Sequence, residues 1–318
     1  MLEHFKVSYY RLELIAGKYG LLLPPYKGST FRGGFGTAFR KITCAQSHTE
    51  CQPCILKPQC PYTYIFETAP PEDTQALRKY DSIPRPFILE PPMETKTEYQ
   101  PGERISFGLV LVGRAIEYLP YFILAFKELG ELGIGKGRRP FQLDKIVAVN
   151  PIDNTEQEVY QANTGKVHNH NLTLTGKTFN RDFNLKPDNQ LTIHYLTMTR
   201  VKHGDHFIRY LEFHMLIRAL LRRLSSILYF HHGLEWEADF RALIDKAETV
   251  DRIKDTTRWV NWERYSNRQE TKMRLGGLVG QVTYQGEFRE FMPILKLGEL
   301  IHVGKAATFG MGKYQMLL

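Results

Sequence analysis

The chain has 318 residues and a formal net charge of +8, and 42% of its residues are hydrophobic. This length predicts one large domain or two of medium size, with enough apolar residues for a core. The sequence holds no apolar run long enough to cross a membrane, and strand-like residues begin almost at once. We therefore expect no signal peptide and a cytoplasmic protein. The positive charge favours a polyanionic partner.

The first half of the chain predicts the element order β-α-β-β-α-β. Aromatic and β-branched residues predict a strand over 5–15, and Ser29 or Thr30 can cap a helix that runs to about residue 42. Strands or extended arms are expected at 62–67 and 85–89, followed by a strand at 104–112, a helix at 116–129 and a strand at 141–149. This order is that of a ferredoxin-like module, once a cysteine-rich segment is set aside.

All the cysteines of the chain lie in that segment, and they are Cys44, Cys51, Cys54 and Cys60. In a cytosolic protein this pattern argues against disulfides. Cys51 and Cys54 have the spacing of a zinc knuckle, so the segment predicts a structural zinc site that pins a loop. An iron–sulfur cluster and reduced, metal-free thiols are the alternatives. His48 lies between the first two cysteines and is interpreted as a residue of this loop or as an exposed side chain.

The second half repeats the same element order. We expect a strand at 190–201, a long helix at 205–231, a second helix at 237–247, paired strands at 259–265 and 278–284, a helix from 291 and a strand at 314–318. The exposed arginines of the long helix are interpreted as a solvated face. The sequence therefore predicts an α+β fold of two tandem ferredoxin-like domains. The N-terminal domain spans 1–152 with the cysteine loop 44–60, the polar junction spans 153–189, and the C-terminal domain spans 190–318 with a glycine-rich loop at 302–314.

The glycine-rich loop near the C-terminus is the most informative feature of the sequence. It follows an apolar helix-like segment and contains Gly304, Lys305, Gly310, Gly312 and Lys313. Glycine permits close backbone approach, and lysine with exposed backbone N–H groups favours an anion such as phosphate. The spacing fits neither a P-loop nor a dinucleotide fingerprint.

A weaker copy of this loop lies in the first half, and its basic residues are Lys136, Arg138 and Arg139. Both copies contain Leu-Gly-Glu-Leu and then Gly-Lys, which indicates duplication of one module. The alternative is a pair of glycine-rich turns with solubilising charge.

Two further segments combine residue types that suit RNA. One is Arg264, Tyr265, Ser266, Arg268 and Gln269, which could contact a phosphate–sugar backbone and stack on bases, or could form a polar turn. The other precedes and begins the first helix. Its members Tyr26, Lys27, Ser29 and Arg32 form, with His48, a second candidate cluster for the chemistry.

His302, at the start of the glycine-rich loop, is the histidine best placed for chemistry. A general acid or base there could help a 2′-hydroxyl attack the adjacent phosphate, with Lys305 stabilising the developing charge. That reaction needs no metal, and the sequence shows no acidic cluster suited to Mg²⁺. A helix cap or a non-catalytic RNA contact is the alternative role for His302.

The loop from His302 to Tyr314 resembles the signature loop of the RAMP superfamily. The stretches 24–36 and 264–269 resemble the CRISPR repeat-cleaving endoribonucleases of that superfamily, and the cysteine segment is similar to one branch of them. The resemblance implies two ferredoxin-like domains and binding of CRISPR repeat RNA or its precursor transcript. It also implies metal-independent cleavage to a 2′,3′-cyclic phosphate and a 5′-hydroxyl, and delivery of the guide RNA to interference-complex subunits.

Many members of that family place a catalytic histidine in or just after the first helix, whereas this chain has no histidine between residues 5 and 44. The catalytic residues are therefore predicted to be His302 and Lys305, with Tyr26 as the fallback. A homodimer is a further expectation. The alternative functions are a non-catalytic RNA-binding subunit of a CRISPR ribonucleoprotein and a small-molecule phosphate enzyme, which would need an acidic metal site.

Overall fold

The computed structural model describes residues 2–46, 50–68, 70, 83–179, 189–266 and 271–317, which divide into two compact units. The N-terminal unit comprises Phe5–Leu174 and Ser226–Leu234. The C-terminal unit comprises Met1–His4, Thr175–Ser225 and Glu235–Leu318. The described residues of the predicted junction, 153–189, are thus shared between the two units rather than forming a linker of their own.

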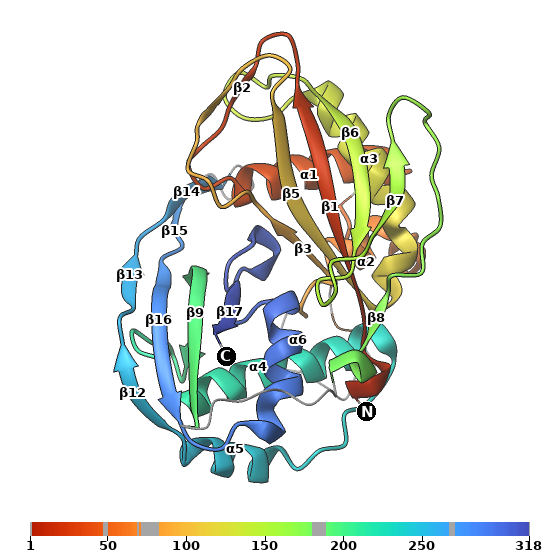
Figure 1. Cartoon of the computed structure of the whole chain (residues 1–318). Coiled ribbons are helices and arrows are strands. Elements are labelled where there is room, and N and C mark those ends of the chain that lie inside the picture. Colours follow the sequence, from red (N-terminus) through yellow and green to blue (C-terminus); the bar gives the residue numbers. More distant parts are fainter. Residues whose placement is uncertain are drawn as a thin grey trace. The chain divides into compact units, whose positions relative to one another are not determined.

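The N-terminal unit is built on an antiparallel sheet (Figure 1). Its strands follow the order β3 (Phe87–Glu90), β5 (Arg104–Val112), β1 (Lys6–Ala16), β6 (Phe141–Val149) and β7 (Glu156–Gln161). The principal helices are α1 (Gly28–Thr43) and α3 (Leu119–Leu132), and the short strands are β2 (Leu21–Leu22), β4 (Glu98–Tyr99) and β8 (Leu174–Thr175). The chain order β1-α1-β3-β5-α3-β6 confirms the predicted ferredoxin-like module, and β7 extends its sheet.

A phenylalanine stripe explains why α1 packs on the sheet. Phe31, Phe35 and Phe39 recur every four residues on one helix face and are buried. The Phe35 ring centroid lies 4.8 Å from that of Phe122 on α3. Two glycines of α1 serve the same packing, because a Cβ at Gly36 would lie 2.3 Å from the Phe66 ring and one at Gly34 would lie 2.8 Å from the Leu129 side chain. Gly34 and Gly36 therefore reflect close packing, whereas a Cβ at Gly33 would meet nothing within 4 Å.

The segment that follows α1 differs from its prediction. Residues 62–67 were expected to be extended, yet Pro61–Ile65 form the short helix α2. Pro61 occupies the first helical turn, where its missing N–H costs nothing. The Thr63 hydroxyl donates to the Lys57 and Cys60 carbonyls at 2.6 and 2.9 Å, which ties the helix to the cysteine segment.

The C-terminal unit repeats the module. Its antiparallel sheet has the order β12 (Asp251–Asp255), β16 (Gly277–Gln285), β9 (Gln190–Thr199) and β17 (Tyr314–Leu317), and β13 (Arg258–Val260) also pairs with β16. Two separate strand pairs accompany this sheet. They are β10 (Lys202–His203) with β11 (His206–Phe207), and β14 (Glu263–Ser266) with β15 (Thr271–Arg274). The helices are α4 (Phe213–Ile227), α5 (Phe240–Glu248) and α6 (Met292–Ile301). The two predicted ferredoxin-like domains are confirmed.

The long helix predicted over 205–231 starts later than expected. Residues 202–207 form the β10–β11 hairpin, and α4 begins only at Phe213. At its other end the helix continues as a π-helical turn, Leu228–His232, and stops at Gly233 with φ of +68°. Predicted strand 259–265 is also divided, because β13 pairs with β16 while β14 pairs with β15.

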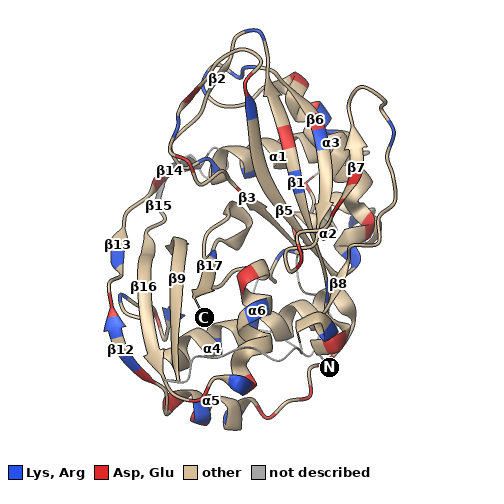
Figure 2. Ribbon diagram, viewed as in Figure 1, with Lys and Arg blue, Asp and Glu red and all other residues tan. Residues whose placement is uncertain are grey.

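Charged residues of both signs are interspersed over the elements of each unit (Figure 2). Net charge therefore does not identify a binding face. A binding face has to be sought in a local group of cations. Within the described ranges, none of the helices is long and apolar enough to cross a membrane.

Candidate nucleic-acid interface

The glycine-rich loop begins where α6 ends and is held against the end of β9. His302 and Gly304 take positive φ values of +61° and +84°. The Lys305 N–H donates to the Arg200 carbonyl at 2.9 Å. A Cβ on Gly304 would lie 2.4 Å from that same carbonyl oxygen, so only glycine allows the approach.

Thr197 of β9 fixes the second part of the loop. Its hydroxyl donates to the Gly310 carbonyl at 2.8 Å and accepts the Lys313 N–H at 2.9 Å. The Gly312 N–H donates to the Met198 carbonyl, and the Gly312 carbonyl accepts the Val303 N–H at 2.9 Å. Backbone bonds at both ends make the loop a fixed platform for the side chains that it exposes.

Lys305 is the exposed cation of this platform. Partial burial lowers the pKa of its amine, and the nearby charges of Arg222 and Lys202 lower that pKa further. Lys202 begins β10 and Arg222 lies on α4, so three elements of the C-terminal unit contribute to one group. We call Lys202, Arg222 and Lys305 the cation cluster. Like charges held together are unfavourable alone and favour an anion such as phosphate.

The cation cluster includes residues that sequence reasoning did not select. Arg222 was interpreted as part of a solvated helix face, and Lys202 was not singled out. Lys202 also pairs with Asp205 at 3.3 Å. Helical periodicity shows which face of α4 Arg222 occupies, but it cannot show that the loop after α6 meets that face.

The loop of the N-terminal unit makes the same contact as the C-terminal one. The Lys136 N–H donates to the Leu22 carbonyl at 2.9 Å, and a Cβ on Gly135 would lie 2.2 Å from that oxygen. Lys136 and Arg138 are exposed, while Arg139 donates to the Tyr19 carbonyl at 2.7 Å. The Gly-Lys pair thus makes the same backbone contact in both units, which supports the predicted duplication.

His302 lies in the interior. Its side chain has 0% exposure, and ring Nδ1 lies 3.0 Å from the Met311 carbonyl, to which an Nδ1–H can donate. The ring therefore joins the two ends of the glycine-rich loop. Its catalytic role stays a prediction, and the burial favours a role in shaping the loop.

The residues before α1 also lie deeper than the sequence indicated. Lys27 is fully buried, and its amine donates to the carbonyls of Glu94 at 2.9 Å and Pro25 at 3.3 Å. Tyr26 is half-buried, and burial, with the charge of Glu90 as a second cause, raises the pKa of its hydroxyl. Tyr26 therefore stays protonated at neutral pH, which suits a hydrogen-bond donor better than a base.

The other residues of this segment are only partly enclosed. Ser29 is half-buried, and the Arg32 guanidinium lies 4.2 Å from the centre of the Phe66 ring. Their RNA-binding roles stay predictions, and burial of Lys27 favours a structural role for its amine.

Several predicted site residues fall where the structure gives no side-chain detail. Arg264, Tyr265 and Ser266 belong to β14, which pairs with β15. Their side chains are not described, and His48, Arg268 and Gln269 lie outside the described residues. The predictions for these residues stay predictions.

The cysteines are partly buried and unbridged. Burial raises the pKa of the Cys51 thiol, and Cys44 and Cys60 are among the groups that act on it electrostatically. In the part of the chain that the structure describes, no group of three or more histidine, cysteine or acidic side chains is arranged to hold a metal ion. Spacing in the sequence remains the only support for zinc at Cys44, Cys51, Cys54 and Cys60.

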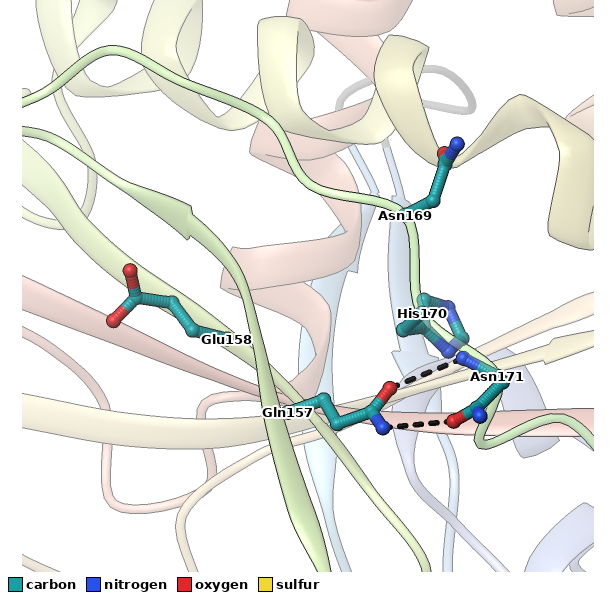
Figure 3. Close-up of a pocket in the computed structure, with 5 residues that line it drawn as sticks. All are labelled: Gln157, Glu158, Asn169, His170 and Asn171. Carbon is teal, nitrogen blue, oxygen red and sulfur yellow. Dashed lines mark hydrogen bonds between the residues drawn. The ribbon is translucent and has the colours of Figure 1, made fainter.

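A polar hollow beside β7 was not foreseen (Figure 3). Its lining residues are Gln157, Glu158, Asn169, His170 and Asn171. The Gln157 and Asn171 amides bond to each other, with Gln157 Nε2 donating at 2.7 Å to Asn171 Oδ1. The Leu172 N–H donates to His170 Nδ1 at 3.3 Å, which leaves Nε2–H to donate to the Tyr10 hydroxyl at 2.9 Å. Because the lining side chains bond to one another and to Tyr10, we assign them a structural role.

Family models match both units. The AF_1859_N family, an N-terminal domain, matches residues 5–172, which are more than half of the chain. The family of the CRISPR-associated endoribonuclease Cas6 matches residues 193–314. The chain belongs to the AF_1859_N family, and its second half matches the Cas6 family. The resemblance to the repeat-cleaving RAMP proteins is thereby confirmed, and the glycine-rich loop lies within the part that matches Cas6.

Individual proteins are similar to this chain over nearly its whole length. A protein of Archaeoglobus fulgidus, described as uncharacterized, is 26% identical over 301 residues, which cover 92% of each chain. The structure of a Thermus thermophilus Cas6 covers 98% of this chain and 99% of its own, with a TM-score of 0.56 and 13% identity. The structure of its product complex covers 98% of this chain and 100% of its own, with a TM-score of 0.59 and 15% identity. At these identities the solved structures show a shared fold.

Proposed function

We propose that this protein binds CRISPR repeat RNA and cleaves the precursor transcript without a metal ion. A 2′-hydroxyl attacks the adjacent phosphorus, so that the 2′-O–P bond forms as the P–O5′ bond breaks. The 2′-hydroxyl proton passes to a base, and the 5′ oxygen gains a proton. The products are a 2′,3′-cyclic phosphate and a 5′-hydroxyl.

The cation cluster on the glycine-rich loop is the observation that carries this proposal. Its members come from three elements of one unit, and the loop beneath them is fixed by backbone bonds to β9. A phosphate placed there relieves the repulsion between the cations, and it would raise the lowered pKa of Lys305. The family that matches the second half is that of the CRISPR-associated endoribonuclease Cas6, and one Thermus Cas6 structure of similar fold is a product complex.

The catalytic residues are assigned by their chemistry. Lys305 stabilises the charge that develops on the phosphate oxygens. Tyr26, which stays protonated, donates a proton or a hydrogen bond instead of serving as a base. His302, whose ring is enclosed, maintains the loop that presents Lys305.

Cleavage of repeat RNA by purified protein in EDTA tests the proposal. We expect cleavage of the natural RNA and none of a matched RNA with a 2′-deoxy nucleotide at the scissile position. Cleavage of both RNAs would show that the 2′-hydroxyl is not the nucleophile. A reaction that stops in EDTA and returns with Mg²⁺ would overturn metal independence.

A non-catalytic RNA-binding subunit is the second candidate. The burial of His302, together with the absence of histidine between residues 5 and 44, favours it. Such a protein would bind repeat RNA and leave both RNAs of the cleavage assay intact.

Zinc and partner proteins are separate proposals. Zinc at the four cysteines rests on their spacing, and zinc analysis of purified wild type and of a Cys51→Ser, Cys54→Ser variant tests it.

Transfer of the guide RNA to interference-complex subunits follows from the family. A partial Cas6-RT-Cas1–Cas2 complex contains a chain of similar fold, with a TM-score of 0.59 at 12% identity, although this chain covers 47% of that one. Light scattering tests the homodimer.

A further inference from the structure

One face of α4 continues away from the cation cluster. His214, Arg218 and Arg222 are spaced four residues apart, so they lie in one row along the helix. Arg222 belongs to the cation cluster. Arg218 has 41% of its side chain exposed, and His214 has 22%. The row thus leads from the glycine-rich loop to a histidine near the start of the helix.

The β10–β11 hairpin borders the same row. Its Lys202 belongs to the cation cluster, and the next residue, His203, packs edge-on against His214 with 6.4 Å between ring centres. The hairpin is anchored at its base, because Arg200 lies 3.8 Å from the centre of the Phe207 ring. Hairpin and helix therefore place a histidine pair at one end of the row and the cation cluster at the other.

The charges that face the histidine pair are mixed. Glu248 of α5 pairs with Arg218 at 2.7 Å and lies 4.0 Å from His214 Nδ1. His206 stands opposite His203 in the hairpin, and Asp205 lies at its turn. Glu212 precedes the helix. Two of these carboxylates are already paired, Glu248 with Arg218 and Asp205 with Lys202.

The surroundings of His214 favour the neutral form of its ring. Burial lowers the pKa of its ring, Arg218 and His203 lower it as well, and Glu248 and Glu212 oppose them. The Arg218 Nε–H donates to His214 Nδ1 at 3.4 Å, which requires that nitrogen to be unprotonated. A polyanion beside His214 would favour its protonated ring, so binding and protonation would be coupled.

We propose that the cation cluster is one end of a phosphodiester track that runs along α4 through Arg218 to the His203–His214 pair, where His214 takes up a proton when RNA binds. The track rests on the proposed function for the identity of its ligand. It extends the interface beyond the glycine-rich loop and makes RNA affinity proton-dependent. The alternative is a histidine pair that only packs the hairpin on the helix.

Binding of repeat RNA to the full chain, followed by fluorescence anisotropy at about pH 5.5 and about pH 7.5, tests the track. The wild type should bind about tenfold more tightly at the lower pH, which corresponds to a shift of one pKa unit in one histidine. His203→Gln combined with His214→Gln should lose most of this gain, measured as the ratio of the variant's own affinities at the two pH values. His203→Gln alone, at an exposed position, should lose part of it without disturbing the fold.

His168→Gln is the matched control, because His168 is an exposed histidine of the other unit. It should retain the full gain at low pH. Equal gains in wild type and double variant would overturn the track while leaving the proposed function intact. Absence of RNA binding by the wild type at both pH values would instead overturn the proposed function, and the track with it.

Discussion

At the scale of single residues, the Gly-Lys pair of each glycine-rich loop determines how the loop is attached. Gly304 admits the Arg200 carbonyl and Lys305 donates its N–H to it, and Gly135 and Lys136 do the same with Leu22. This bond fixes the backbone of the lysine, from which its side chain extends. The sequence shows that glycine and lysine recur, but the partner carbonyl comes from a distant part of the chain.

Gly304→Ala should destabilise the C-terminal unit more than Gly204→Ala does. Both glycines have positive φ, which costs alanine about 1–2 kcal/mol. A Cβ at 204 meets nothing within 4 Å, whereas at 304 it lies 2.4 Å from the Arg200 carbonyl oxygen. We expect a further loss of about 1–3 kcal/mol for Gly304→Ala in urea denaturation. Equal losses would show that the loop moves away without cost.

His170 should make the N-terminal unit less stable in mild acid. Burial lowers the pKa of its ring in the folded state, so the unfolded chain binds the proton more tightly. The stabilisation is complete above the unfolded pKa of about 6.5 and is lost as the pH falls below it. Urea denaturation at about pH 8 and about pH 5.5 should show a smaller decrease for His170→Gln than for wild type. An identical decrease would exclude this residue as the cause.

At the scale of elements, periodicity predicted most helices and strands because their buried faces are long. Two failures have local causes. The second strand of the β10–β11 hairpin was predicted as the start of a helix, although Gly204 and Asp205 between two short extended pairs are a two-residue turn signal. The α2 segment was read as a strand from its aromatic residues, although Pro61 is typical of a first helical turn. Whether a short segment forms a helix or a strand depends on such turn and cap residues.

Within α1, two alanine substitutions should have opposite effects. A Cβ at Gly33 meets nothing within 4 Å, so Gly33→Ala should stabilise the helix by about 0.5–1 kcal/mol. A Cβ at Gly36 would lie 2.3 Å from the Phe66 ring, so Gly36→Ala should cost about 1–3 kcal/mol. Thermal and urea denaturation compare the variants. Stabilisation by both would contradict the packing role of Gly36.

At the scale of the whole molecule, the duplicated order of elements was visible in the sequence, and so was the glycine-rich loop of each copy. The cation cluster was only partly visible. Lys305 could be selected because it follows glycine, whereas Lys202 and Arg222 join it through the fold of the C-terminal unit. His302 was selected because it lies beside the loop, and its burial depends on the same fold. Neighbours in space, unlike neighbours in sequence, could not be predicted.

The salt dependence of repeat-RNA binding by Lys305→Ala tests the interface most directly. Arg241→Ala is the matched control, because Arg241 is an exposed cation of the same unit that pairs with Asp245 on α5. Lys305→Ala should bind more weakly and should reduce the slope of log K against log salt by about 0.7 for each lost phosphate contact. Arg241→Ala should match the wild type in both. A Lys305→Ala protein with the affinity and the slope of the wild type would contradict an RNA-binding role for the cation cluster.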